Sequence, residues 1–351
     1  MFHFKIDKKK ISEKSPIYII AEAGVNHNGS LSKAKKLIDI AVKAKADAVK
    51  FQTFKAENII VPKGPKAKYH IETTGSNKSL SWFNLLKSQE ISLSMHKELI
   101  RYCKKKKITF LSTPYDQDSA TLLDKLKIHA FKIASTDNDN YPFISFMKKF
   151  KKPIILSTAM STFEEVKFAY QLLKKFNFKK FSIMQCTGNY PTKIENANLN
   201  VIDQYKKYFK CPIGFSDHTE GSTAAICAVA KGVKIIEKHF TISKKLNGPD
   251  HRMSLEPKEL IEYIKSIRIA EKSLGMTDKK ILLSEEENKK KLKKSLVAKK
   301  FIKKGQRISR SLIDIKRPGH GIRPKDIKKI LGKKTNCNIK EHTILNINML
   351  Y

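Results

Sequence analysis

Two apolar runs in the second half of the chain, PIGFSD (residues 212–217) and VKIIEKHF (233–240), end in a similar way. His218 directly follows the first run, beside Asp217, and His239 lies near the end of the second, beside Lys238. Short apolar runs of this kind are typical of buried strands. Two interpretations of the histidines remain open at this point: ordinary polar strand ends, or a metal or catalytic site.

Six further runs of the same character precede these two. They are IYIIAEAG (17–24), ADAVKFQ (46–52), ITFLSTP (108–114), AFKIAS (130–135), PIILSTA (153–159) and FSIMQCT (181–187). Between them lie amphipathic, helix-length stretches, among them 31–45, 94–106, 118–127 and 162–176. Alternating strands and helices indicate parallel pairing. Eight such units in about 250 residues predict a TIM (β/α)8 barrel. A doubly wound open sheet is the alternative, but no GxGxxG motif follows the first run.

Changes in composition predict how the chain divides. A helix over 256–275 should close the barrel, so we expect a barrel domain over 1–280 and a charged linker or connecting helix over 281–294. The remaining residues, 295–351, have short strand-like pieces broken by glycine and proline. They predict a small β-rich domain near the lower size limit for independent folding. Within the barrel, the connection over 55–89 is too long for an ordinary βα loop, and we expect it to act as an active-site lid.

Composition narrows the class of protein. The formal net charge is +38, but only seven of the 71 basic residues are arginine, and the 64 lysines are spread along the chain. Nucleic-acid readers usually rely on arginine and concentrate charge on one face, so we expect no nucleic-acid partner. A lysine-rich protein that binds anionic polymers remains an alternative. No apolar run is long enough for a membrane span, no secretory signal is visible and the five cysteines lack CxxC spacing, so we expect a cytoplasmic protein.

Every one of the eight runs ends in polar residues, and this is the strongest functional signal. In a TIM barrel these ends meet at one rim, where active sites are built. The polar residues are Glu22, Lys50, Gln52, Ser112, Thr113, Lys132, Ser135, Ser157, Thr158, Thr187, Asn189, Tyr190, Ser216, Asp217, His218, Glu237, Lys238 and His239.

The residue types at this rim suggest two kinds of chemistry. Lys50, Lys132 and Lys238 together predict a site for a phosphate or carboxylate. His218 and His239 are within reach of one divalent metal ion, which would polarise a carbonyl or activate water. A Schiff-base aldolase that uses Lys132 or Lys238 is the competing barrel chemistry.

The chain resembles the sialic acid (nonulosonate) synthase family over nearly its whole length. The resemblance rests on IAEAGVNHNGS, ADAVKFQTF, FLSTPYD, FKIAS, ILSTAMS, NYPT, GFSDHTEG, EKHFT, GPDHRMSLEP and KRPGHGI. It implies a TIM barrel joined to a C-terminal antifreeze-like (SAF) domain. It also implies a metal-dependent transferase of carbohydrate biosynthesis. Such an enzyme forms a carbon–carbon bond between phosphoenolpyruvate and the open-chain form of an N-acetylated amino-hexose, and it releases phosphate. Besides the lysine-rich binder of anionic polymers, a second non-enzymatic alternative is a carbohydrate binder that uses only the SAF domain. It does not explain the polar strand ends.

The resemblance also assigns roles to individual residues. His218 and His239 match the ligands of a divalent metal, usually manganese, with magnesium and cobalt as alternatives, and Glu22 matches a residue that contacts the sugar and handles a proton. Lys50, Lys132, Ser135, Ser157 and Ser216 match residues that hold phosphoenolpyruvate. Gln52, Thr113, Asn189, Tyr190 and Asp250 match residues that line the same pocket. Arg317 matches an arginine that one subunit inserts into its partner's active site, which implies a domain-swapped homodimer.

Two departures from the family pattern concern the choice of sugar. Thr136–Asp137 stands where related N-acetylneuraminate synthases often carry Gly–Glu, so Asp137 reaches less far towards sugar hydroxyls. Gly188 lacks a side chain that some relatives have at this position. From the resemblance we expect N-acetylmannosamine as the acceptor and N-acetylneuraminate or a close nonulosonate as the product. A legionaminate or pseudaminate synthase, acting on a diacetamido-trideoxyhexose, is the alternative.

Overall fold

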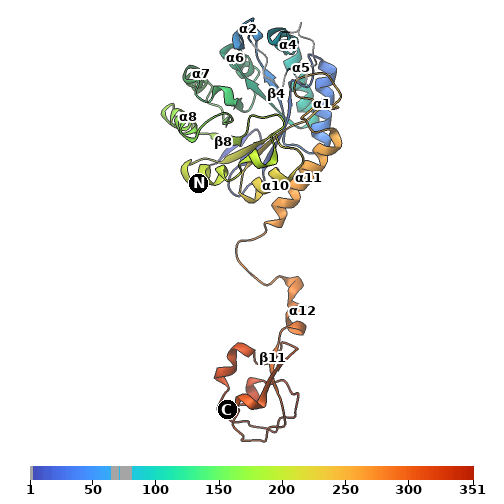
Figure 1. Ribbon diagram of the computed structural model, residues 1–351, viewed down its shortest axis with the longest axis vertical. Helices are drawn as coiled ribbons and strands as arrows, with labels where there is room; N and C mark the ends of the chain where they lie inside the picture. Colours follow the sequence, from blue (N-terminus) through green and yellow to red (C-terminus); the bar gives the residue numbers. More distant parts are fainter. Residues whose placement is uncertain (1–2, 65–70, 72–80) are drawn as a thin grey trace. The chain divides into compact units, whose positions relative to one another are not determined.

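The computed structural model describes residues 3–64, 71 and 81–351. The chain forms two compact units, Met1–Gly275 and Met276–Tyr351 (Figure 1). The expected lid over 55–89 lies partly outside the described residues, and only its two ends are considered below. Among the described helices, none is both long and apolar enough to cross a membrane.

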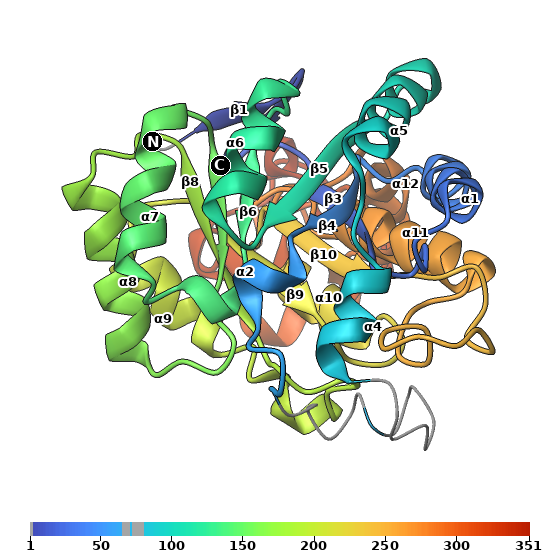
Figure 2. The ribbon, with the colours of Figure 1, turned by 90° about the horizontal axis from the view of Figure 1, so that it is seen from above.

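The first unit is a closed barrel of eight parallel strands surrounded by helices (Figure 2). Its strands are β3 (Tyr18–Gly24), β4 (Ala48–Thr53), β5 (Thr109–Pro114), β6 (Phe131–Ile133), β7 (Ile154–Ser157), β8 (Phe181–Cys186), β9 (Ile213–Asp217) and β10 (Ile235–His239). Each strand pairs with the next in sequence, and β10 also pairs with β3, with His239 opposite Glu22. This closure confirms the predicted TIM barrel and excludes the open doubly wound sheet.

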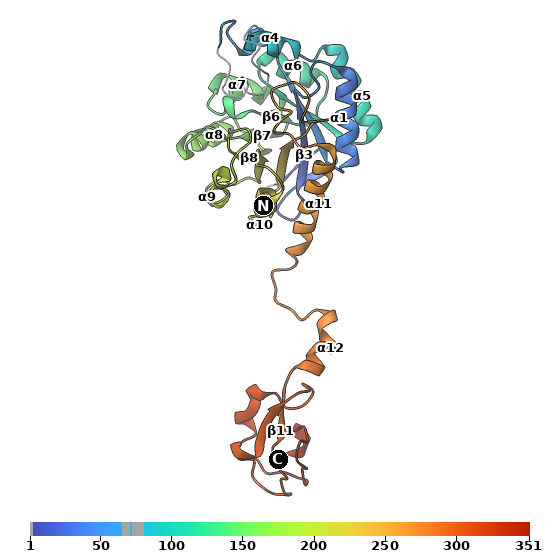
Figure 3. The same ribbon diagram turned by 45° about the vertical axis from the view of Figure 1, so that its right-hand side comes forward.

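Side chains alternate between the two faces of each strand, so every second residue points into the barrel. These inward-facing residues are apolar near the strand starts and polar near the strand ends. Inward-facing residues near the strand starts form an apolar cluster, which includes Ile20, Ala48 and Ile235. The same cluster includes Phe4, Ile6 and Ile11, from a hairpin of β1 (Phe4–Ile6) and β2 (Lys9–Ile11) that the sequence analysis did not anticipate. The hairpin packs on the strand starts, whereas α2 (Ala56–Ile59) and α4 (Trp82–Ser88), which follow the end of β4, lie at the top of this unit (Figure 1, Figure 3). The hairpin therefore closes the apolar end and leaves the polar end for the site.

Helices cover the outer face of the barrel. They are α1 (Leu31–Lys43), α5 (Leu93–Lys106), α6 (Gln117–Lys125), α7 (Tyr141–Met147), α8 (Phe163–Lys175), α9 (Val201–Tyr208), α10 (Thr223–Ala230) and α11 (Pro257–Ser273), whereas α2 and α4 lie at the polar end. Several start at the caps that their sequences predict. Thr162 and Glu165, for example, form a reciprocal capping box at the start of α8. The buried stripes of α1, α5 and α8 pack into the same apolar cluster as the outward-facing strand residues.

The second unit is the small β domain. Its strands β11 (Ser295–Ala298) and β12 (Ile313–Lys316) are antiparallel, and its core includes Leu296, Ile302, Ile308 and Leu345. Helix α12 (Leu283–Leu292) precedes them and falls within the segment expected to be a linker or connecting helix.

Candidate active site

The polar end of the barrel opens into a cavity of about 490 Å3. Strand-end residues from all eight barrel strands or the loops that follow them line it, and these are Glu22, Lys50, Gln52, Thr113, Lys132, Ser135, Ser157, Cys186, Tyr190, Ser216, His218, Glu237, His239 and Asp250. The alternation that puts Ile20 and Ile235 into the apolar layer also puts Glu22 and Glu237, two residues later, into the polar layer. We call this space the catalytic cavity.

Two buried lysines form its cationic floor. Lys50 Nζ lies 3.0 Å from Glu22 Oε2 and donates a 2.9 Å hydrogen bond to Thr113 Oγ1. Lys132 Nζ donates to Ser157 Oγ at 2.6 Å. Glu237 Oε1 lies between the two ammonium groups, 3.5 Å from Lys50 Nζ and 3.4 Å from Lys132 Nζ. The floor is thus a cluster of alternating charges that a multiply charged anion can join.

The two carboxyl groups of this cluster have opposite pKa shifts. Burial raises the pKa of Glu22 to about 7, although Lys50 works in the other direction. Burial would also raise the pKa of Glu237, but the ammonium groups of Lys132 and Lys50 outweigh it and lower the pKa to about 2. Near neutral pH Glu237 is therefore ionised, whereas Glu22 can gain or lose a proton.

His218 and His239 face each other across the cavity wall, with ring centroids 5.6 Å apart. His218 Nδ1 lies 2.7 Å from the Thr187 carbonyl oxygen. Because a carbonyl oxygen only accepts, Nδ1 carries a hydrogen, and Nε2 is the nitrogen of His218 that can present a lone pair when the ring is neutral. His239 Nδ1 is buried and has no hydrogen-bond partner among the described residues. Burial and the neighbouring His218 hold the pKa of His239 well below its usual value, so this imidazole is neutral.

These nitrogens fit a divalent cation as a partial ligand set. Both imidazoles can present a lone pair, and Asp250 Oδ2 lies 3.9 Å from His239 Nδ1. Across the described ranges, no three histidine, cysteine or acidic side chains are gathered as a complete metal site. A metal held here would therefore have two protein nitrogens and open positions for water or substrate.

Glu22, Gln52 and Asp250 converge at Gly24. A Cβ placed on Gly24 would lie 3.4 Å from Gln52 Nε2, 3.4 Å from Glu22 Oε1 and 3.5 Å from Asp250 Oδ2. Gly24 also has φ +52°, which favours glycine. This glycine therefore lets three polar side chains gather beside the histidines, where the hydroxyls of a sugar can be bound.

Much of the remaining wall of the catalytic cavity is apolar, although Gln89 and Tyr115 also line it. The apolar part includes Phe54, directly after β4, Ile59 and Ile60 from the start of the 55–89 connection, and Trp82, Leu85 and Leu86 from α4. The described ends of this connection therefore contribute to the site, as the length of the insertion suggested. Such a wall favours methyl groups over hydroxyls.

Lys238 and Asp217 do not line the cavity, which corrects the expectation that Lys238 belongs to the anion site. Lys238 Nζ lies 3.2 Å from Asp217 Oδ2, and Asp217 Oδ2 accepts a 2.7 Å hydrogen bond from Tyr263 on α11. Both residues are one position away from inward-facing Glu237 and Ser216, so strand alternation turns them towards the outer helices. Lys238 is thereby excluded as a Schiff-base lysine in this cavity.

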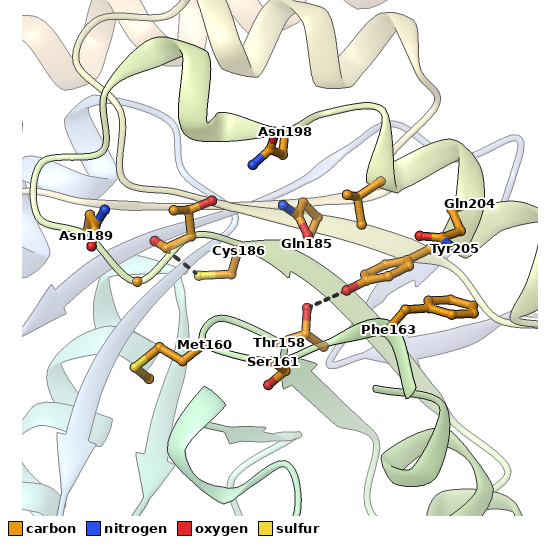
Figure 4. A pocket seen from close by; sticks show the side chains of 13 residues that line it. Thr158, Met160, Ser161, Phe163, Gln185, Cys186, Asn189, Asn198, Gln204 and Tyr205 are labelled. Carbon is orange, nitrogen blue, oxygen red and sulfur yellow. Dashed lines mark hydrogen bonds between the residues drawn. The ribbon is translucent and has the colours of Figure 1, made fainter. Parts of the chain in front are cut away.

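Two other expected residues, Asp137 and Asn189, do not line the catalytic cavity. Asp137 accepts a hydrogen bond from Asn140 Nδ2 at 2.8 Å and does not line the catalytic cavity, whereas Thr136 does. Asn189 lines a neighbouring cavity instead (Figure 4). Arg317 belongs to the second unit.

Sequence reasoning missed some residues of the site. Glu237 was noted as a strand end but given no role, although its position two residues after Ile235 placed it inside the barrel. Cys186 was treated only as a cysteine without a partner, but its Sγ lies 3.8 Å from His218 Nδ1. The apolar residues of α4 carried no recognisable signal, because a tryptophan and two leucines are ordinary helix residues.

Comparison with known proteins identifies the family. The model of the NeuB family matches residues 37–279, and that of the SAF domain matches residues 293–350. The chain belongs to the NeuB family. It is therefore a member of the phosphoenolpyruvate-condensing nonulosonate synthases, as its motifs suggested.

Known relatives differ in their sequence identity to this NeuB protein. It is 44% identical to the N,N'-diacetyllegionaminic acid synthase of Campylobacter jejuni, over 93% of this chain and 98% of the relative. It is 34% identical to human N-acetylneuraminate-9-phosphate synthase, over 94% and 92% of the two chains. The crystal structure of the N-acetylneuraminic acid synthetase of Leptospira borgpetersenii superposes with a TM-score of 0.71 at 34% identity, covering 82% of this chain and 94% of that one. These values favour the alternative expectation, a legionaminate-type synthase, over an N-acetylneuraminate synthase.

Proposed function

We propose that this protein condenses phosphoenolpyruvate with an open-chain diacetamido-trideoxyhexose to give N,N'-diacetyllegionaminic acid and phosphate. The observation that carries the proposal is the 44% identity to a synthase of that name over 93% of the chain. The apolar wall of the catalytic cavity agrees with it, because a deoxy sugar replaces hydroxyls by hydrogen or methyl groups.

Phosphoenolpyruvate binds on the cationic floor. Lys50 and Lys132 attract its carboxylate and phosphate, and the hydroxyls of Ser135, Ser157 and Ser216 supply hydrogen bonds. The negative charge of Glu237 opposes the binding of an anion close to it. Protonation of Glu22 removes the second negative charge of this cluster and therefore favours binding. Because the pKa of Glu22 is raised to about 7, this proton is available near neutral pH.

The reaction forms one carbon–carbon bond, and at a second carbon it replaces the bond to the phosphate oxygen by a bond to an oxygen from water. The methylene carbon of phosphoenolpyruvate attacks the aldehyde carbon of the sugar, and the aldehyde oxygen takes up a proton. Water adds to the cationic carbon that results and loses a proton, and phosphate then leaves with cleavage of its bond to that carbon while the added hydroxyl loses its proton and becomes the keto oxygen of the product. Glu22 lies beside Gln52 and is the residue of this cluster that can exchange a proton with the reacting groups.

A divalent cation, with manganese as the first choice, would supply electrophilic polarisation of the aldehyde when bound. His218 and His239 would hold it, and Asp250 would lie beside it. Tyr190 packs against His218, with ring centroids 4.2 Å apart and the two ring planes tilted by 35°.

The proposal includes a homodimer in which Arg317 of each chain completes the partner's site. It rests on the family resemblance of the KRPGHGI motif and on the match of residues 293–350 to the SAF domain. A guanidinium group donates hydrogen bonds that suit the hydroxyl and acetamido oxygens of the bound sugar.

The test is phosphate release from phosphoenolpyruvate with manganese and a panel of acceptors. The panel contains the diacetamido-trideoxyhexoses of the legionaminate and pseudaminate routes and N-acetylmannosamine. We expect the highest kcat/KM with the legionaminate precursor. Absence of phosphate release with every sugar would refute the synthase proposal, and preference for N-acetylmannosamine would refute the proposed acceptor. Borohydride treatment with substrate present should leave the mass of the protein unchanged, since no Schiff base is involved.

A further inference from the structure

Asn26 is a fully buried asparagine in the turn between β3 and α1, just outside the lining of the catalytic cavity. Its Nδ2 donates two hydrogen bonds, at 2.8 Å to the Phe240 carbonyl oxygen and at 3.0 Å to Ser254 Oγ. These partners lie 214 and 228 residues further along the chain. One side-chain amide therefore joins the end of the first barrel strand to the segment that follows the last one.

The first of these bonds holds the backbone directly after His239. The Phe240 N–H donates to the Glu22 carbonyl oxygen at 3.0 Å, and the Phe240 carbonyl oxygen accepts from Asn26. Both polar groups of this residue's backbone are thus bound by the segment that carries Glu22 into the cavity. A shift of His239 along the barrel axis would break these bonds.

The second bond leads to Asp250. Ser254 Oγ accepts from Asn26 and donates to the Asp250 carbonyl oxygen at 2.5 Å. The Asp250 side chain lines the catalytic cavity, where its Oδ2 lies 3.9 Å from His239 Nδ1. Asn26 therefore holds both members of this pair, the imidazole through Phe240 and the carboxylate through Ser254.

Other contacts hold the 247–254 turn as a whole. Asn28 Nδ2 donates to the Asn247 carbonyl oxygen at 2.8 Å, and His251 Nδ1 lies 2.6 Å from Thr241 Oγ1. Because these contacts do not involve Asn26, we expect the turn to stay folded when Asn26 is replaced. The replacement would then change the placement of His239 and Asp250 without removing the turn.

Asn26 also carries a cost. Its Oδ1 is buried and has no hydrogen-bond partner among the described residues. Burying a polar atom in this way lowers folding stability. The two bonds from Nδ2 are therefore the feature of this side chain that needs an explanation, and both of them end beside the site.

We infer that Asn26 is a positioning residue that sets the separation of His239 and Asp250, and thereby the affinity of the site for a divalent cation. Groups that orient metal ligands without touching the metal contribute tenfold or more to metal affinity in other proteins. The inference rests on the proposed role of His239 as a metal ligand.

The experiment measures the manganese affinity of the full chain directly, from the electron paramagnetic resonance signal of free manganese and without substrates. We expect Asn26→Ala to raise the Kd about tenfold, because His239 and Asp250 lose their common anchor. Ser254→Ala should raise the Kd less, since the bond from Asn26 to the Phe240 carbonyl oxygen remains. If Asn26→Ala does not fold, Ser254→Ala decides, and an unchanged Kd in that variant overturns the inference.

Steady-state kinetics give a second measurement that a loss of stability alone would not change. In Asn26→Ala at saturating manganese, KM for the acceptor sugar should rise, because the sugar is bound beside Asp250. KM for phosphoenolpyruvate should stay at the wild-type value, because Lys50 and Lys132 hold it at the cationic floor. A rise of both KM values by the same factor would contradict a positioning role.

Asn138→Ala is the matched control. Asn138 is also a buried asparagine whose Nδ2 donates to a serine hydroxyl, that of Ser161, and it does not line the catalytic cavity. This variant should lose stability in urea unfolding and keep the wild-type Kd for manganese. A rise in its Kd as large as that of Asn26→Ala would overturn the inference, because the effect would then follow from lost stability.

The outcomes separate this inference from the proposed function. If the wild-type protein binds manganese and both Asn26→Ala and Ser254→Ala, folded by circular dichroism, keep the wild-type Kd, Asn26 has no positioning role and the proposed function stands. If the wild-type protein binds no manganese, the proposed metal site fails and this inference fails with it.

Discussion

Glu22 and Glu237 show how neighbouring groups decide the charge of a buried carboxyl. Both are buried side chains of the polar layer of the barrel. Glu237 Oε1 is within 3.5 Å of two ammonium groups, whereas Glu22 has one such partner, Lys50. One more cation outweighs the cost of burying a charge, so Glu237 remains ionised and Glu22 titrates near neutral pH.

We predict that Glu22 makes folding stability depend on pH. Its pKa rises from 4.5 to about 7 on folding, so the folded protein holds a proton that the unfolded chain has lost between these values. The resulting stabilisation is fully present below pH 4.5 and is lost as the pH rises through 7, an effect of up to about 3 kcal/mol. Glu22→Gln should remove it. The measurement is urea unfolding of both proteins at several pH values.

Other groups titrate in the same window, so the quantity to follow is the difference in unfolding free energy between wild type and variant. Glu262→Gln, at a side chain that is 68% exposed, serves as the control and should show no such trend. A wild-type-minus-Glu22→Gln difference that stays constant from pH 4.5 to pH 7.5 would contradict the prediction.

We predict that His218→Ala combined with His239→Ala abolishes manganese retention, because these are the two histidines among the described residues that line the catalytic cavity. Elemental analysis after dialysis measures the metal, and circular dichroism checks the fold. His129→Ala, at a half-exposed side chain, is the control. Wild-type metal content in the double variant would refute the assignment of these residues as ligands.

At the scale of elements, successive side chains of β9 and β10 point alternately into the catalytic cavity and towards the outer helices. Ser216, Glu237 and His239 line the catalytic cavity, whereas Asp217 and Lys238 bind each other behind the strands. Tyr263 on α11 donates to Asp217, and Asp217 Oδ1 accepts from the backbone N–H of Thr219 at 2.8 Å. This outer network fixes the ends of the two strands that carry the histidines.

We predict that Tyr263→Phe lowers the free energy of unfolding by about 1.5–3 kcal/mol, because it removes a buried hydrogen bond to a charged acceptor. Thermal or urea unfolding measures the loss. The matched control, Tyr208→Phe, changes a tyrosine that is 44% exposed and should have little effect. Equal stability of the two variants would show that the outer network does not stabilise the barrel.

The eight strands were predictable, and some other elements were not. Each strand is an apolar run buried on both faces, so its position follows from the sequence within one or two residues. The N-terminal hairpin was missed because its strands, FKI and KKI, have three residues each and contain lysines. The apolar side chains of these two strands become part of the core only by packing on the strand starts of the closed barrel, which the local sequence does not show.

At the scale of the whole molecule, the proposed dimer can be tested by mixing inactive variants. Arg317→Ala and His218→Ala/His239→Ala should each lack activity. If Arg317 acts in the partner's site, dimers exchanged between them contain one intact site, and random mixing should restore about a quarter of the wild-type activity.

The measurement is phosphate release after co-expression or subunit exchange. Each variant mixed with itself is the control and should stay inactive. No recovery in mixtures that are shown to contain mixed dimers would mean that Arg317 acts within its own chain, or not at all.

The sequence by itself determined the barrel, the small C-terminal domain, the family and the set of strand ends that meet at one rim. These follow from apolar periodicity and ordered motifs, which are local properties of the chain. Only the tertiary structure decided which polar residue faces the cavity and which faces the helices. A shift of one position along a strand turns a side chain to the other face, and this placed Lys238 and Asp217 behind the site. The distances between residues far apart in the sequence also come from the closed barrel alone. They placed Glu237 between two lysines and His218 beside His239.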